Sequence, residues 1–300
     1  MDCIEQAVEL LAAEPVCGYY AGQQPAVEPT ALAALALAAK SRTEESTIAC
    51  QWLASVQAED GSLAVRKDAD TPRWPTALAV LAWTAQHARE SASSDPRYQQ
   101  NIDQAITWSL SLYGEALEPS GVHGHDVTLQ GWPWVAGTYS WIEPTALHVA
   151  ALKAAGRNEH PRTREAVRLL IDRQLATGGC NYGNTTVLGQ RLRPHVQPTG
   201  TALLALAGES DHRGRIQRSL GYLAGALHLE TTTTSLCWGL MGLAAHEFLP
   251  AESERWLTAA SGRLDRRRES PYQRALLILA SLGRQCPLVA LPREAQQHGT

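Results

Sequence analysis

The chain has 300 residues, of which 44% are hydrophobic and 19% are charged, so it can bury a substantial core as one large domain or two small ones. A net charge of −4 and a pI near 6.2 give no electrostatic reason to expect nucleic acid as a partner, and the densest basic run, residues 263–268, is typical of a solvated helix end. No apolar run reaches the roughly 18 to 20 residues of a membrane span, although peripheral membrane contact stays open.

Six cysteines are spread along the chain without C-x-x-C spacing, and no basic and apolar leader precedes the first expected helix. This pattern favours reduced thiols and a cytoplasmic location. We expect no cofactor.

Helix after helix is expected to begin with one short phrase, Pro-Thr-Ala-Leu or a looser copy of it. Proline is favoured as the first helical residue because it donates no hydrogen bond there, so the residue before it is predicted to be the N-cap. The predicted N-caps, which should gather at one end of the molecule, are Glu28, Trp74, Glu143, Gln197, Thr234 and Ser270.

In chain order, amphipathic helices are expected to alternate with helices that are apolar all round. A first amphipathic helix over 2–13 precedes an apolar helix from Pro29, which has no polar face and must be buried on all sides. The later amphipathic helices are expected at 44–57, 97–113, 162–175, 212–227 and 252–264, and the later apolar helices from Pro75, Pro144, Pro198, Ser235 and Pro271.

Twelve helices in six outer–inner pairs indicate either an open solenoid or a closed ring. The first and last inner helices are as apolar as the middle ones, whereas an open solenoid needs polar ends. We therefore predict an all-α (α/α)6 toroid that forms a single domain over residues 1–286, with a C-terminal tail at 287–300. Long loops enter the first four inner helices, so a binding site is expected on their rim.

Two segments resemble the repeats of the terpenoid cyclase and protein prenyltransferase α/α toroids, the squalene-cyclase-type repeat family. One runs from Gln51-Trp52 to Gly61-Ser62-Leu63, and the other is the turn Gly178-Gly179-Cys180. The resemblance covers nearly the whole chain. It implies a hydrophobic isoprenoid-type substrate, bound in a central cavity and transformed there if the chain is a cyclase-like or transferase-like enzyme.

The activity motifs of that family are not intact in this chain. The Asp-rich cyclase motif, laid on Thr145-Ala146, leaves Glu143 as its only acid, and laid on Thr30-Ala31 it leaves only Glu28. The zinc motif has Ser235 in place of its histidine, and no Asp-x-Cys occurs, so no zinc site of that type is expected.

Glu28 and Glu143 are the candidate catalytic residues. They can be plain helix caps, in which case the helix dipole should lower their pKa, or an acid and base pair on one rim. The expected substrate-binding residues are the aromatics of the same rim together with two inner-wall residues: Trp74, Trp134, Tyr139, Trp141, Tyr182, Gln197 and Cys237.

Two further functions stay open on the same residues. A carbohydrate-active (α/α)6 enzyme would use the paired carboxylates for catalysis and the aromatics for sugar stacking, and a non-catalytic scaffold would present the loops to a protein partner. His123, His125 and Asp126 lie together in one loop and could ligate a metal with Cys180 or His195, but no metal is assigned.

Overall fold

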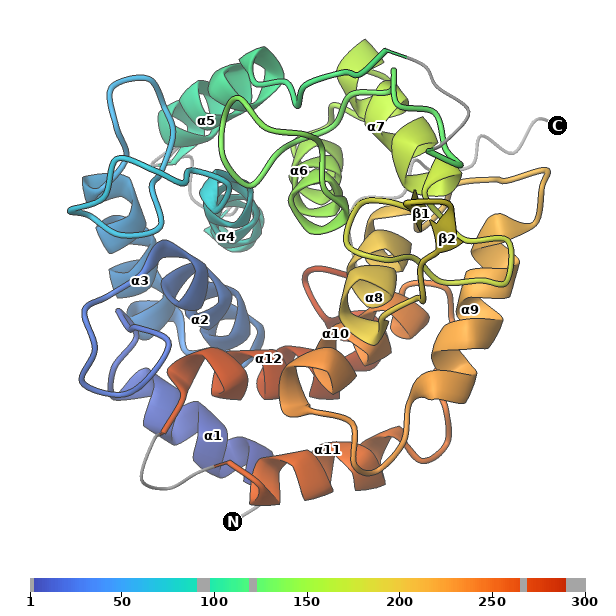
Figure 1. Ribbon diagram of the computed structural model, residues 1–300. Helices are drawn as coiled ribbons and strands as arrows, with labels where there is room; N and C mark the ends of the chain where they lie inside the picture. Colours follow the sequence, from blue (N-terminus) through green and yellow to red (C-terminus); the bar gives the residue numbers. More distant parts are fainter. Residues whose placement is uncertain (1–2, 91–97, 119–122, 265–268, 290–300) are drawn as a thin grey trace, which may run out of the picture.

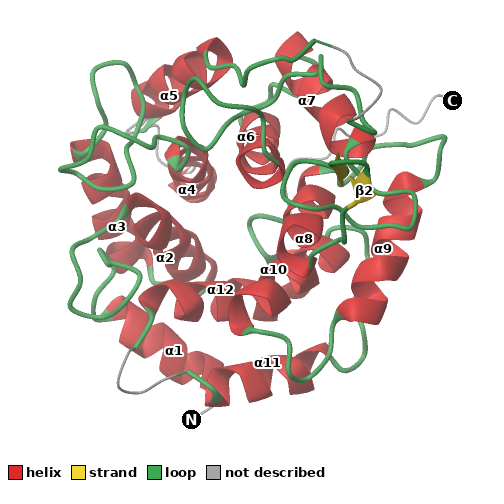
Figure 2. Cartoon of the chain, in the orientation of Figure 1, coloured by secondary structure: helices red, strands yellow, loops and turns green. Residues whose placement is uncertain are grey.

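Twelve α-helices make up almost all the regular structure of the computed structural model, which describes residues 3–90, 98–118, 123–264 and 269–289. They lie in two concentric layers (Figure 1), and loops join them around the ring (Figure 2). The inner helices are α2 (Val27–Ala39), α4 (Thr76–Glu90), α6 (Ile142–Ala154), α8 (Val196–Ala205), α10 (Thr233–Ala244) and α12 (Pro271–Ser281). The outer helices are α1 (Cys3–Ala12), α3 (Thr43–Ser55), α5 (Gln99–Ser111), α7 (Pro161–Asp172), α9 (Arg215–Ala226) and α11 (Ser253–Gly262).

The inner layer closes on itself. Each inner helix packs against the next, and α12 packs against α2, so the last repeat meets the first. The predicted (α/α)6 toroid is therefore confirmed. Short elements complete the described part: the hairpin β1 (Thr186–Val187) and β2 (Gln190–Arg191), and a 3-10 turn, η1 (Gly283–Gln285).

Apolar inner helices form the core, as their sequences predict. In α2 every residue from Pro29 to Ala38 is buried, and α6 is buried from its first residue to Lys153. Small residues let neighbouring inner helices approach closely: a Cβ on Gly200 of α8 would lie 2.4 Å from the backbone oxygen of Trp238 in α10. No described helix has the length and apolarity needed to cross a bilayer.

The inner helices do not begin where the phrase predicts. The N-caps of α2, α6 and α8 are Ala26, Trp141 and His195, none of which makes a side-chain cap bond. Glu28, Glu143 and Gln197 are therefore the second helical residues and not the caps. Proline is tolerated as the third helical residue because the first-turn N–H groups have no partner within the helix.

The other predicted caps fall into two groups. Ser270 caps α12 as predicted, since its hydroxyl accepts from the backbone N–H of Gln273. Thr234 lies inside α10, whose N-cap is Thr232, and α4 begins at Thr76, two residues after Trp74. The cap prediction is correct only where the helix begins at its proline.

The threonine of the phrase docks the preceding long loop onto the inner helix. In four repeats one loop residue donates its backbone N–H to the threonine Oγ1 at 2.8–3.2 Å, and its carbonyl oxygen lies 3.1–3.4 Å from the same hydroxyl. The four buried pairs are Cys17 with Thr30, Leu63 with Thr76, Trp132 with Thr145, and Cys180 with Thr199. The phrase thus places four long loops on one rim.

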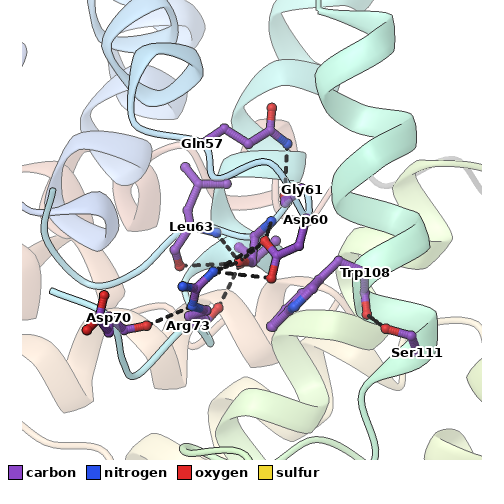
Figure 3. Close-up of polar contacts among 10 residues, drawn as sticks. Gln57, Asp60, Gly61, Leu63, Asp70, Arg73, Trp108 and Ser111 are labelled. Carbon is purple, nitrogen blue, oxygen red and sulfur yellow. Dashed lines mark hydrogen bonds and ion pairs between the residues drawn. The ribbon is translucent and has the colours of Figure 1, made fainter.

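A polar cluster fixes the loop that enters α4 (Figure 3). Asp60 accepts from the Ser62 backbone N–H at 3.0 Å and from its hydroxyl at 2.6 Å, and the Arg73 guanidinium lies 3.2 Å from both Asp60 carboxylate oxygens. Although burial opposes the change, the Ser62 and Arg73 contacts lower the pKa of Asp60, which keeps the ion pair formed. Arg73 directly precedes Trp74, so this cluster positions that tryptophan.

Two of the segments discussed from the sequence lie partly outside the residues that the structure describes. Residues 265–268 of the basic run, and 290–300 of the expected tail, lie outside the described residues. All six cysteines lie in the described residues and form no disulfide there, and five of them are buried.

Candidate functional site

Polar side chains at the second position of four inner helices define the candidate site. Glu28 holds this position in α2, Glu143 in α6, Gln197 in α8 and Tyr272 in α12. Each inner helix follows an outer helix that runs back along the ring wall, so the inner N-termini share one rim, beneath the long loops (Figure 1). Equivalent positions therefore bring these four groups to the same end of the ring.

Two tyrosines hold the Glu28 carboxyl. Tyr19, from the loop before α2, donates its hydroxyl to Glu28 Oε2 at 2.5 Å, and the Tyr272 side chain acts on the same carboxyl by lowering its pKa. The two tyrosine rings lie 5.4 Å apart. Burial raises the pKa of both phenols, so both stay protonated and act as donors.

The pKa of Glu28 is raised to about 7. Burial is the largest cause, and the Glu143 carboxylate adds repulsion, while the two tyrosine hydrogen bonds act in the opposite direction. Glu143 is therefore near enough to Glu28 to influence its ionisation, although α4 lies between their helices in the ring. Near neutral pH both the protonated and the ionised form of the Glu28 carboxyl are therefore populated.

Glu143 is 8% exposed and has a different partner. The Gln197 side-chain amide donates to Glu143 Oε1 at 2.7 Å. Burial raises the pKa of Glu143, and the Gln197 hydrogen bond lowers it. The helix dipole was expected to lower the pKa of both carboxyls. That expectation is wrong in sign, because desolvation outweighs the helix-terminus contribution at both positions.

Most of the predicted aromatics meet on the same loops. The Trp74 and Trp134 rings meet edge to face at 4.8 Å, which joins the loops that enter α4 and α6. The Tyr182 ring lies 5.0 Å from the His195 ring, and a Cβ on Gly183 would lie 3.1 Å from the Trp141 ring. These contacts join the starts of α6 and α8.

Two of the predicted lining residues are placed differently. The Tyr139 side chain is 48% exposed on the loop, while Cys237 is fully buried in the core. Burial raises the pKa of the Cys237 thiol, which leaves it protonated. As placed, Cys237 has no access to a ligand on the rim.

Tyr272 is the site residue that the sequence did not reveal. Aligned on their prolines, the five phrases that contain one put Ser270 opposite Glu28, whereas aligned on the observed helix starts, α2 and α12 put Tyr272 there. The difference arises because α12 begins at its proline and α2 begins two residues earlier. A tyrosine in place of the usual threonine after the proline was the signal in the sequence.

The histidine loop does not form a metal centre in the described residues, where no group of three or more His, Cys, Asp or Glu side chains is arranged to hold an ion. The His125 Nδ1 lies 3.1 Å from the Thr185 hydroxyl, and the Asp126 backbone N–H donates to Asp172. Burial lowers the pKa of His125 to about 4. These contacts join the histidine loop to the loop that enters α8 and to the end of α7.

A separate hollow of about 560 Å³ lies on the outer wall of the ring. It is lined by residues of α9, α11 and the loop between α10 and α11: Ala224, Leu227, Glu247, Phe248, Leu249, Pro250, Glu252 and Trp256. None of them belongs to the carboxyl site, which is defined by its charges and hydrogen bonds.

Comparison with known proteins shows the fold and no family. No protein-family model and no curated protein matches the chain. Among solved structures the chain is similar to a glycosidase variant, with 9% identity, a TM-score of 0.62 and 97% of both chains covered. It is equally similar to an inactive α-1,6-mannanase from Salegentibacter in complex with α-1,6-mannotriose, with 11% identity, a TM-score of 0.62, and 97% of this chain and 100% of that chain covered.

Two other solved structures share the fold of this chain. A protein from Actinoplanes has 15% identity and a TM-score of 0.59, with 95% of this chain and 98% of that chain covered. A Salmonella alpha-2-macroglobulin has 15% identity and a TM-score of 0.54, but this chain covers only 17% of that protein. At these identities the likeness shows a shared α/α toroid fold.

These neighbours correct the main functional expectation. An isoprenoid-type substrate, and with it the prenyltransferase, terpenoid cyclase and squalene cyclase assignments, is contradicted because toroids similar over the full length are glycosidases. The repeat phrases are features of a toroid scaffold, and one scaffold supports different chemistries.

Proposed function

We propose that this protein is a carbohydrate-active enzyme that cleaves a glycosidic bond, with Glu28 and Glu143 as its two carboxyl groups. The observation that carries the proposal is the placement of two carboxyls on one rim, Glu143 buried and Glu28 partly buried, each with its own hydrogen-bond partner and with Glu143 raising the pKa of Glu28. Glycoside cleavage commonly uses two such carboxyls, one protonated and one ionised.

Glu28 is the proposed general acid. A pKa of about 7 keeps a large share of this carboxyl protonated near neutral pH, where it can still give up the proton. In the reaction the proton moves from Glu28 to the glycosidic oxygen as the bond from that oxygen to the anomeric carbon breaks. The leaving sugar departs as an alcohol.

Glu143 is the proposed ionised partner. The Gln197 amide donates to its carboxylate, which favours the charged form relative to a buried carboxyl without such a donor. Glu143 either takes a proton from the attacking water or attacks the anomeric carbon itself. The separation of the two carboxyls in the substrate complex decides between inversion and retention, and the anomer of the first product reports it.

The aromatic loops are the proposed sugar-binding surface. The edge-to-face pair Trp74 and Trp134, together with Trp141 and Tyr182, lies on the loops of the rim that carries the carboxyls, and sugar C–H groups pack well on aromatic faces. The neighbouring mannanase was solved with α-1,6-mannotriose, so α-linked mannooligosaccharides are the first substrates to test. That variant carries two consecutive aspartates replaced by asparagine, and this chain has no Asp-Asp pair, so its own carboxyls must act.

The test is hydrolysis of a panel of α- and β-linked oligosaccharides, including α-1,6-mannotriose, followed by chromatography of the products. We expect one linkage class to be cleaved, and we expect Glu28→Gln and Glu143→Gln each to lower the rate at least about 100-fold, the scale of a lost acid or base. Glu59→Gln, on an exposed carboxyl outside the site, should retain the rate. Cleavage that survives both site substitutions would refute the assignment.

A further inference from the structure

The first and last repeats of the ring meet directly at Glu28. The Ser270 hydroxyl, which caps α12, donates to the carbonyl oxygen of Tyr19 at 2.7 Å across a separation of 251 residues. The Ala21 backbone N–H donates to the Glu269 carbonyl oxygen at 2.7 Å. Two hydrogen bonds thus fix the loop that carries Tyr19 to the start of the last inner helix.

Both partners of the Glu28 carboxyl depend on that junction. Tyr19 lies in the docked loop, and Tyr272 lies two residues after Ser270 in the chain. Their rings contact each other at 5.4 Å, the Tyr19 hydroxyl donates to the Glu28 carboxyl, and Tyr272 lowers the pKa of that carboxyl. The elements packed directly against α2 are α1, α3, α4 and α12, and of these α12 supplies Tyr272.

We propose that closure of the ring positions the Glu28 carboxyl: Tyr19 and Tyr272 hold it as positioning residues, and Ser270 locks the Tyr19 loop to the last repeat. The geometry requires this arrangement because a single-repeat displacement of α12 would withdraw Tyr272 and release Tyr19 together. The last repeat, which contributes neither proposed catalytic carboxyl, is thereby part of the active site. This assignment rests on the proposed function only for its catalytic consequence.

Three groups set the titration of Glu28: Tyr19, Tyr272 and the Glu143 carboxylate. Tyr19, which donates to the carboxylate, and Tyr272 both favour its ionised form, which holds the pKa below the value that burial alone would produce. Removal of either hydroxyl therefore raises the pKa of Glu28. Release of the Tyr19 loop should act in the same direction.

The experiment is an NMR titration of protein labelled with ¹³C in the glutamate carboxyls, with the Glu28 signal identified by its loss in Glu28→Gln. We expect a midpoint near 7 in the wild type. Tyr19→Phe and Tyr272→Phe should each move it upward by about one pH unit, the effect of one lost hydrogen bond to a charged group. Tyr20→Phe, on the exposed neighbouring tyrosine, is the matched control and should leave it unchanged.

Ser270 provides a test that keeps both phenols. Ser270→Ala should move the Glu28 midpoint upward, and Ser270→Thr, which retains a hydroxyl as cap and donor, should restore it. Unchanged midpoints in Tyr19→Phe and Tyr272→Phe, in variants whose spectra show the native fold, would overturn the proposal. So would an upward shift of equal size in Tyr20→Phe.

The titration also separates this inference from the proposed function. Shifted midpoints without hydrolysis of any oligosaccharide would support the positioning of Glu28 and refute the glycosidase assignment. Hydrolysis that depends on Glu28, with titration midpoints that stay unchanged in Tyr19→Phe and Tyr272→Phe, would support the glycosidase assignment and refute the positioning of Glu28. Neither readout relies on the other.

Discussion

Replacement of Glu28 by glutamine should stabilise the protein above neutral pH. A carboxyl whose pKa is higher in the folded than in the unfolded state binds its proton more tightly when folded. Well below pH 4.5 both states of Glu28 are protonated, and the residue has no effect on the free energy of unfolding. As the pH rises to about 7 the unfolded state ionises first, so that free energy falls.

The size of the effect follows from the raised pKa. A rise from 4.5 to about 7 corresponds to about 3 kcal/mol of destabilisation once the folded-state carboxyl is ionised. Glutamine keeps an acceptor for Tyr19 but is a weaker acceptor than a carboxylate, so we expect a net gain of about 2 kcal/mol. The residue proposed as the general acid thus lowers stability at the pH where the enzyme would work.

Urea unfolding at pH 4.5 and pH 8.5 measures this difference. Glu28→Gln should be more stable than the wild type at pH 8.5 and nearly equal to it at pH 4.5. The exposed control Glu59→Gln should match the wild type at both values. Equal effects at the two pH values, or destabilisation at pH 8.5, would show that Glu28 is not a buried carboxyl of raised pKa.

Three further predictions address the scaffold and the second carboxyl. Gly200→Ala should cost about 3 kcal/mol in the free energy of urea unfolding because its Cβ meets the backbone of α10, whereas Gly225→Ala, with open space around it, should stabilise by about 0.5 kcal/mol; equal effects would contradict the close packing. Thr145→Val should cost about 2 kcal/mol, since a buried loop N–H loses its acceptor, and should increase amide exchange in that loop; unchanged exchange would contradict the docking. Gln197→Leu should raise the pKa of Glu143 and move the acidic limb of any pH–rate profile upward; an unmoved limb would contradict this pairing.

The fold could be predicted because two signals agree. Inner helices without a polar face can exist only when covered on all sides, and six of them with equivalent starts leave a closed ring as the solution. The residues at which the inner helices begin were predicted less well. The proline is the third helical residue in α2 and the first in α12, and it directly precedes α4, so the phrase does not fix where the helix begins.

The candidate site was predictable in its location and less so in its chemistry. Glu28, Glu143 and Gln197 stand at the same place in three copies of one phrase, so their convergence on one rim follows from the repeat. The direction of the pKa shifts of Glu28 and Glu143 depends on burial, which the sequence does not reveal. Tyr272 was missed for a different reason, because its helix starts in a different register.

The substrate class could not be derived from the repeat, since a toroid scaffold fixes where a site lies and leaves its chemistry to a few side chains. The family resemblance pointed to an apolar ligand. The observed rim instead presents two coupled carboxyls, two phenols and an amide. Such groups are suited to proton transfer and to hydrogen bonds with hydroxyls.

The most direct test of the glycosidase assignment is a crystal structure of Glu28→Gln with the oligosaccharide that the wild type cleaves best. We predict electron density for two sugar rings that meet between residue 28 and Glu143, with the glycosidic oxygen within hydrogen-bond distance of the residue 28 side chain and one ring packed on Trp74 or Trp134. A sugar bound elsewhere on the ring, with the space between residue 28 and Glu143 free of it, would contradict the assignment.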